Sequence, residues 1–309
     1  MFDFIRHRLL QALISILGVL TIIFFALQLS GDPVVLMVPV GASQQDIAEV
    51  RRSLGLDRPL LIQYANYILD LVRLNLGNSL VQNVPVTTVI ADRMGYTIAL
   101  AATALAFALI CGVTAGIIIA VRRDSWIGHG LSGVVLAAQS LPTFWSGILL
   151  IFVFAVWLGW LPPSGAQTAS SIILPALALG FFSMATFARI TRMSVLEELS
   201  KEYVRTARSK GIGMGRLVVR HVLRNASIPI IAIAALETAS LLTGAIIVET
   251  MFAWPGLGQV TIQALSARDF PVVQGIVLVG AVTAIGLNLM ADLLYAAVDP
   301  RVRYGYRPC

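Results

Sequence analysis

Six long apolar stretches divide this chain of 309 residues and restrict it to one class of fold. A helix of about 20 residues crosses the roughly 30 Å hydrocarbon core of a bilayer, so each stretch is long enough to span it. Because unpaired backbone groups are excluded from lipid, we expect a helix in each stretch. The sequence therefore predicts an all-α polytopic membrane protein with six transmembrane helices. The stretches cover residues 9–29, 97–120, 131–158, 171–193, 230–249 and 272–298.

The composition agrees with a membrane setting. Hydrophobic residues make up 58% of the chain and charged residues 12%, whereas a soluble domain carries about 25% charged residues. The net charge of +6 comes mainly from arginines near the ends of the apolar stretches. No segment clusters arginine with aromatic residues as a base-stacking surface would. We therefore expect the lipid bilayer as a partner and no nucleic acid.

The loop charges predict the orientation, because short loops rich in Arg and Lys stay in the cytoplasm. Arg6 and Arg8 precede the first stretch, Arg122 and Arg123 follow the second, and loop 159–170 is neutral. Both termini are then cytoplasmic, and the first stretch reads as a retained span, being longer than a secretory signal core. The predicted parts are a cytoplasmic N-terminus (1–8), a first transmembrane helix (9–29), an external cap loop (30–96), a five-helix core (97–298) with a cytoplasmic loop (194–229), and a cytoplasmic tail (299–309).

The long segment after the first stretch predicts a small ordered cap. Gly31, Asp32 and Pro33 end the first span, since glycine and proline break a helix and aspartate marks the water boundary. Ser43 with Asp46 three residues later predicts a helix start. Helical apolar spacing on a half-buried face follows. The cap has two compatible interpretations: packing over the spans, or a landing surface for an external protein. The spaced apolar residues are Ile47, Val50, Leu54, Leu60, Tyr64, Tyr67, Ile68, Leu71 and Val72.

A strongly basic segment, residues 202–229, lies between the fourth and fifth stretches. Its charge places it in the cytoplasm. Ala207 and Gly211 are four residues apart, so on a helix they would share one face that a partner can approach closely. The segment therefore predicts a docking element for a soluble protein. Its basic residues are Arg205, Arg208, Lys210, Arg216, Arg220 and Arg224.

Residues for catalysis are missing from the sequence. Neither lysine, Lys201 or Lys210, lies in a phosphate-binding G-x-x-x-x-G-K-[ST] loop, so an ATPase driving this protein would be another chain. The three histidines form no H-E-x-x-H pair, and Cys111 and Cys309 indicate neither a disulfide framework nor a metal site. We expect no catalytic residue, no metal ligand and no cofactor bound by this chain.

Polar residues inside the apolar stretches are the candidates for a pathway. Glu237, Ser240 and Gly244 fall at helical spacing on one face of the fifth stretch. An acidic side chain within the membrane is costly, so Glu237 should face protein or water. It either pairs with an arginine or serine of another helix or attracts the positive group of a substrate. Gln139 and Ser140 precede a proline kink that either lines a passage or serves packing.

Several short motifs, spread over nearly the whole chain, resemble those of one family, the inner-membrane permeases of bacterial ABC importers. The basic segment is similar to their coupling loop, in the version found in the dipeptide/oligopeptide/nickel branch, and the chain resembles its dipeptide permease B-type members. The matching runs are Gly31-Asp32-Pro33, Leu54-Gly55-Leu56-Asp57-Arg58-Pro59, Tyr203-Val204-Arg205-Thr206-Ala207-Arg208-Ser209-Lys210-Gly211 with His221 to Pro229 downstream, Glu249-Thr250-Met251-Phe252-Ala253-Trp254-Pro255-Gly256-Leu257-Gly258, and Asp299-Pro300-Arg301-Val302-Arg303.

The resemblance implies the type I importer permease fold and a non-enzymatic subunit of the cell inner membrane. It implies a second homologous permease, two ABC ATPase subunits that bind ATP and Mg, and an extracytoplasmic substrate-binding protein. The loop 197–229 would transmit ATPase motion to the spans. The residues carried over are Glu202, Tyr203, Arg205, Thr206, Ala207 and Gly211 for coupling, and Asp32, Asp57, Arg58, Glu249 and Trp254 for docking of the binding protein. The candidate pathway residues remain the polar ones named above: Gln139, Ser140, Glu237, Ser240 and Gly244.

The sequence departs from the broad family pattern at three places, one of which is Pro229, which falls further along the chain than the pattern would put it. Arg205, Thr206 and Ala207 stand where the importer loop has Glu-Ala-Ala, and Glu237 stands where an uncharged polar residue is expected. The expected cargo is a di- or oligopeptide, with nickel chelates, glutathione or opines as alternatives on the same scaffold. From other classes, an ion-coupled secondary transporter would show inverted repeats and broken helices, and an intramembrane hydrolase rests only on the short run Gly130-Leu131-Ser132-Gly133.

Overall fold

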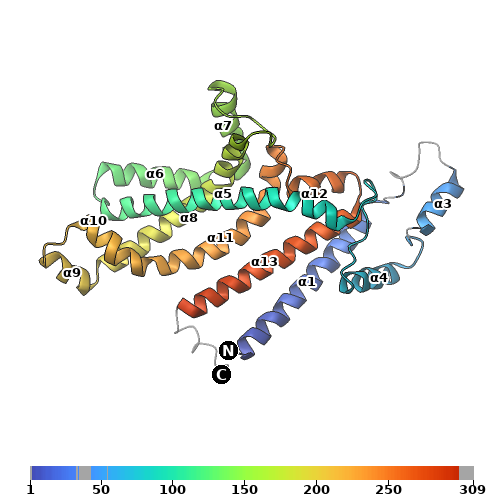
Figure 1. The fold of residues 1–309 in the computed structure, drawn as a ribbon, viewed down its shortest axis with the longest axis horizontal. Coiled ribbons are helices and arrows are strands. Elements are labelled where there is room, and N and C mark those ends of the chain that lie inside the picture. Colours follow the sequence, from blue (N-terminus) through green and yellow to red (C-terminus); the bar gives the residue numbers. More distant parts are fainter. Residues whose placement is uncertain (1, 33, 35–42, 54, 299–309) are drawn as a thin grey trace. The chain divides into compact units, whose positions relative to one another are not determined.

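The computed structural model describes residues 2–32, 34, 43–53 and 55–298, and the described part is helical without a strand. The predicted all-α class is thereby confirmed (Figure 1). The elements are α1 (Phe2–Ser30), α3 (Gln44–Ser53), α4 (Leu60–Val72), α5 (Val86–Val121), α6 (Trp126–Ser140), α7 (Thr143–Leu150), the π-helical η1 (Ile151–Trp157), the 3-10 turn η2 (Ala169–Ile172), α8 (Ile173–Leu199), α9 (Glu202–Ser209), α10 (Met214–Leu217), the π-helical η3 (Val218–Val222), α11 (Leu223–Met251), α12 (Leu257–Ser266) and α13 (Phe270–Val298).

Five helical stretches of the described chain are long and apolar enough to cross a membrane. The sixth predicted span is a bent pair: α6 and the helix formed by α7 and η1 meet at 111°. The break lies at Pro142, which lacks an N–H and forces Leu141 into an extended conformation. The kink predicted at Pro142 is therefore a break between two helices. The five stretches are Leu10–Leu29, Val86–Val121, Ala169–Leu199, Met214–Met251 and Phe270–Ala291.

Two helices reach well beyond the predicted spans. The 36 residues of α5 correspond to about 54 Å of helix, more than the roughly 30 Å hydrocarbon core needs. Helix α5 thus begins inside the predicted external loop. The helical stretch Met214–Met251 likewise includes Pro229 and the basic residues Arg216, Arg220 and Arg224. The segment expected as the coupling loop is helical over most of its length.

The chain forms two compact units, of which the second comprises residues 98–254 and 286–309. Helix α8 is its centre and contacts α6, α7 and α11 (Figure 1). Glycines let α5 approach α8 closely: a Cβ at Gly112 would lie 2.5 Å from the Met184 carbonyl oxygen, and one at Gly116 2.5 Å from that of Ala188. Such small-xxx-small pairs are how membrane helices pack without a hydrophobic driving force.

The first unit comprises residues 1–97 and 255–285. Its core joins Leu27 of α1, Ile90 of α5, Val260 of α12 and Val273 of α13. Together these contacts place the ends of four helices around one apolar centre. The buried carboxylate of Asp269 makes a second set of contacts within this unit.

Asp269 holds the loop before α5. It accepts hydrogen bonds from Ser79 Oγ at 2.5 Å, from the Leu80 N–H at 3.1 Å and from the Val81 N–H at 3.4 Å. We call these four residues the Asp269 junction. Arg268 also donates to the Asp32 carbonyl at 3.0 Å. The connection between α12 and α13 thus orders two loops of the first unit.

The helix start predicted at Ser43 is confirmed. Ser43 and Asp46 cap α3 reciprocally: the Ser43 N–H donates to the Asp46 carboxylate at 3.0 Å, and the Asp46 N–H to Ser43 Oγ at 3.2 Å. These bonds lower the pKa of Asp46. The expected half-buried face holds for Ile47, Val50, Tyr64, Tyr67, Ile68 and Leu71, whereas Leu60 and Val72 are exposed at the ends of α4 and Leu54 lies outside the described residues.

Candidate functional site

Helix α9 lies in the basic segment and is seated by one apolar face. Val204 is buried and joins Val195, Leu217 and Val222 in one cluster, to which Ala207 adds a half-buried contact. The other face of α9 is exposed and polar, with Glu202, Tyr203, Arg205, Thr206, Arg208 and Ser209. The helix is therefore fixed to the second unit while a charged surface remains open to a partner.

The exposed surface is cationic. Arg205 pairs with Glu202 at 3.6 Å, but both side chains are more than four-fifths exposed, so the pair contributes little stability. The exposed basic residues flanking this pair are Arg208, Lys210, Arg216, Arg220 and Arg224. Such a surface suits a protein partner with an acidic rim.

Gly211 ends α9 instead of lying on its face. Its φ is +77°, the left-handed region that favours glycine. The Gly211 N–H donates to the Arg208 carbonyl at 2.9 Å and the Ile212 N–H to the Ala207 carbonyl at 3.3 Å, the two bonds of a Schellman motif. The prediction that Ala207 and Gly211 share a helix face is wrong, because the helix stops at Ser209.

A buried carboxylate joins α9 to two long helices. Glu198, near the end of α8, is only 7% exposed. It accepts hydrogen bonds from Lys201 Nζ, from the Tyr203 hydroxyl at 2.6 Å and from Asn225 Nδ2 of α11 at 3.2 Å. We call these four residues the Glu198 junction. One side chain thereby fixes the position of α9 relative to both α8 and α11.

The electrostatics of the junction favour its present protonation states. The hydrogen bond to Glu198 raises the pKa of Lys201. Burial, followed by the bond to Glu198, raises the pKa of Tyr203. Both donors therefore keep their protons throughout the neutral range. A buried carboxylate with three donors is satisfied, and removal of any donor leaves part of its charge uncompensated.

Glu198 and Asn225 are not among the coupling residues predicted from the sequence. Glu197 and Glu198 are adjacent and chemically alike, and nothing in the sequence alone says which of them is buried. The two differ only in the fold: Glu198 follows buried Val195 by three positions on α8, whereas Glu197 faces solvent.

The predicted pathway residues fall on two helices of the second unit. Ser183 of α8 donates a 2.5 Å hydrogen bond to the half-buried Glu237 carboxylate, so the serine partner foreseen for Glu237 is present. Ser240 and Gly244 are exposed one and two turns further along α11. Gln139 and Ser140 lie in the last turn of α6, immediately before the break, where the Ser140 hydroxyl donates to the Leu136 carbonyl.

The predicted docking residues divide into two groups. Asp57 and Arg58 are exposed in the turn between α3 and α4, and Asp32 contacts Arg51. Glu249 is fully buried and Trp254 is 5% exposed, so their expected contact with an external protein is wrong. Both belong to the packing of the second unit, where the Trp254 N–H donates to the Glu249 carbonyl at 2.8 Å.

Within the described ranges, no three His, Cys, Asp or Glu side chains come together as a metal site would require. The chemistry that the two junctions offer is hydrogen bonding and ion pairing. Both act on the position of helices.

Comparison with known families covers almost the whole chain. A family model described as "Binding-protein-dependent transport system inner membrane component" matches residues 112–304. A second, described as "Binding-prot-dependent transport system membrane comp, N-term", matches residues 1–101.

Two relatives are similar over their full length. The glutathione transport system permease protein GsiC of Escherichia coli (strain K12) is 41% identical over 305 residues, which is 98% of this chain and 100% of the relative. A putative peptide transport system permease protein, BAB2_1050 of Brucella abortus (strain 2308), is 37% identical over 310 residues, covering 97% and 98%.

Solved structures show the same fold at low identity. A chain of the inward-facing MetNI methionine ABC transporter aligns with a TM-score of 0.56 and 17% identity, covering 69% of this chain and 97% of that one. A chain of an amino acid ABC transporter crystallised with histidines aligns with a TM-score of 0.53 and 19% identity, covering 68% and 94%.

Proposed function

Since the chain belongs to the family of binding-protein-dependent transport system inner-membrane components, as a permease subunit of a dipeptide/oligopeptide-type ABC importer, we propose that it forms half of a pathway for short peptides. A second homologous permease supplies the other half. Two ABC ATPases, which bind ATP and Mg, dock on its cytoplasmic side. Both termini face that side, as the loop charges favour.

The observation that carries the coupling proposal is the Glu198 junction. A partner that moves α9 also pulls on α8 and α11, because one buried carboxylate of α8 accepts hydrogen bonds from the start of α9 and from α11. The exposed residues Glu202, Tyr203, Arg205 and Thr206 provide the contact surface. The ATPases drive the change only by contacting α9 differently in their two states.

The proposed pathway uses Glu237, Ser240 and Gly244 of α11 and Gln139 and Ser140 at the break after α6. Glu237 supplies a negative charge that can attract the ammonium group of a peptide, and its bond from Ser183 orients it. The small side chains at 240 and 244 leave room along the same face of α11.

The extracytoplasmic binding protein docks on the cap. Asp57 and Arg58 support this because both are exposed beside α4, and Asp32 lies where α1 ends. Glu249 and Trp254 take no part, since they are buried.

The proposed cargo is a short peptide. Its support is the peptide chemistry common to the relatives: one is named for glutathione, itself a tripeptide, and the other for peptides. Glutathione, nickel chelates and opines are the alternative cargoes on the same scaffold.

The test is uptake by the complete importer in proteoliposomes. We expect ATP-dependent accumulation of labelled trialanine, competed by dialanine or glutathione and not by a nickel chelate. Competition by the nickel chelate alone would replace the proposed cargo. Proteoliposomes holding this chain alone should accumulate nothing, and uphill uptake by them would instead indicate an ion-coupled secondary transporter.

A further inference from the structure

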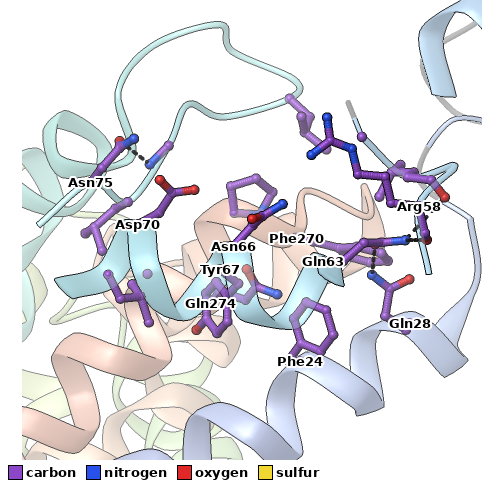
Figure 2. Close-up of a pocket in the computed structure, with 18 of the residues that line it drawn as sticks. Phe24, Gln28, Arg58, Gln63, Asn66, Tyr67, Asp70, Asn75, Phe270 and Gln274 are labelled. Carbon is purple, nitrogen blue, oxygen red and sulfur yellow. Dashed lines mark hydrogen bonds between the residues drawn. The ribbon is translucent and has the colours of Figure 1, made fainter. Parts of the chain in front are cut away.

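A half-open cavity of about 450 Å³ lies wholly within the first unit, among α1, α4 and the start of α13 (Figure 2). This volume falls in the range of small-molecule sites, roughly 300–1,000 Å³. None of the predicted pathway residues lines it. The cavity is therefore distinct from the predicted pathway.

Aromatic side chains make part of the cavity wall. Phe24 and Tyr67 stack with their ring centroids 5.5 Å apart, and Phe270 adds a third ring. The Tyr67 hydroxyl oxygen is buried and finds no hydrogen-bond partner in the described part of the chain, and burial raises its pKa. The Tyr67 ring therefore forms part of the apolar wall, whereas its hydroxyl oxygen is closed off from the cavity.

Amide side chains lie along the same cavity. Gln63, Asn66, Tyr67 and Asp70 fall at i, i+3, i+4 and i+7 and so share one face of α4. Gln63 is engaged, because its amide donates to the Arg58 carbonyl at 2.8 Å. Asn66 and Gln274 make no side-chain hydrogen bond among the described residues, and Figure 2 shows them with Asp70 around the cavity.

Opposite charges lie toward the two ends of this lining. Asp70 is in the last part of α4 and Arg58 precedes its first turn, and neither has an ion-pair partner within the described ranges. This order of charges suits a ligand with a cation at one end and an anion at the other.

We propose that this cavity binds a short peptide with free ends. Asp70 takes the ammonium group, Arg58 takes the carboxylate, and the amides of Asn66 and Gln274 take main-chain groups. Charge-assisted hydrogen bonds at both ends are the strongest of these contacts. The ligand class rests on the proposed function, and the site is a second peptide-binding position besides the pathway.

The test is equilibrium binding of trialanine to the complete permease–ATPase complex in nanodiscs, without ATP and without the binding protein. Omitting the binding protein removes any docking role of Arg58 from the result. We expect the unaltered complex to bind trialanine, and Asp70→Asn and Arg58→Gln each to weaken binding about tenfold.

Blocked peptides assign the two ends. N-acetylation of trialanine should weaken binding to the unaltered complex and to Arg58→Gln but not weaken it further in Asp70→Asn, and C-terminal amidation should show the reverse pattern. The exposed residues Glu49 and Arg73 lie outside the lining, so Glu49→Gln and Arg73→Gln are matched charge controls that should bind normally.

Uptake assays on the same complexes separate this inference from the proposed function. Uptake of trialanine without equilibrium binding, or equal affinity for free and blocked peptides, would overturn the peptide site and leave the importer role standing. Binding that depends on Asp70 and Arg58 in a complex that takes up no peptide would establish the site and overturn the proposed cargo.

Discussion

The Asp269 junction of the first unit and the Glu198 junction of the second are both built on a carboxylate, but the two have different roles. Each buries a carboxylate where a helix ends and satisfies it with three donors. Two of the donors to Asp269 are backbone N–H groups, whose positions the chain itself fixes. All donors to Glu198 are side chains from Lys201, Tyr203 and Asn225.

The difference bears on movement. Backbone donors hold a loop in one conformation, because rotation away from the carboxylate would require the loop to refold. Side-chain donors can change rotamer while the helices stay intact, and the Lys201 side chain is 45% exposed, within reach of a partner protein. The Asp269 junction is therefore suited to holding a fixed structure, and the Glu198 junction to transmitting motion.

Removal of the carboxylate should lower the free energy of unfolding more at the Asp269 junction than at the Glu198 junction. In Asp269→Ala, one buried hydroxyl and two part-buried N–H groups lose their acceptor, and we expect a loss of about 3 kcal/mol in the free energy of unfolding. Hydrogen exchange at the amides of Leu80 and Val81 should accelerate. Reversible denaturation in detergent micelles and mass-resolved exchange measure the two effects.

The matched control for that change is Asp92→Ala, in which an exposed aspartate of the same unit is removed. It should leave both measurements unchanged. Slow exchange at Leu80 and Val81 in Asp269→Ala would mean that the loop holds without its acceptor, and the contrast between the two junctions would fail.

The second-largest expected effect is on the coupling of ATP hydrolysis to peptide uptake. Glu198→Gln keeps the size of the side chain but removes the charge that holds Lys201, so we expect a stability loss of about 1–2 kcal/mol. In the assembled importer, ATP hydrolysis should continue while peptide uptake per ATP falls several-fold. Parallel hydrolysis and uptake assays in proteoliposomes measure this ratio.

Glu197→Gln is the control, because the neighbouring glutamate is exposed. It should leave uptake per ATP unchanged. If Glu198→Gln lowered hydrolysis and uptake together, the junction would serve assembly or stability and not transmission.

The sequence predicted those features that depend on local chemistry. Apolar length indicated the spans, Ser43 and Asp46 indicated the start of α3, and the basic segment contains α9. It could not predict features that depend on tertiary contacts. The burial of Glu249 and Trp254 follows from how α11 packs in the second unit, and the choice of Glu198 over Glu197 depends on which way α8 faces. The 111° bend exceeds what Pro142 alone indicates, because a proline specifies a break but not its angle.

A smaller effect should follow from changing the turn after α9. Gly211 has open space where a Cβ would lie, so only its φ of +77° resists substitution. Gly211→Val should cost about 1–2 kcal/mol and lower uptake per ATP, whereas Gly211→Asn, which tolerates this conformation, should cost less and keep uptake. Equal effects of the two variants would show that the left-handed conformation of the turn does not determine stability or uptake per ATP.

The smallest expected effect is a dependence on alkaline pH that only one junction should show. The folded-state pKa values of Lys201 and Tyr203 are raised, above unfolded values of about 10.4 and 10. Their contribution to stability is therefore complete below about pH 9 and is lost as the pH rises through the folded-state values.

The stability difference between the unaltered protein and Lys201→Met/Tyr203→Phe should shrink above about pH 10. The difference for Ser79→Ala should stay constant, since the donors to Asp269 do not titrate in that range. Denaturation at a series of pH values between 8 and 11 measures both differences, and a parallel decline in the two would remove the distinction between fixed and adjustable donors.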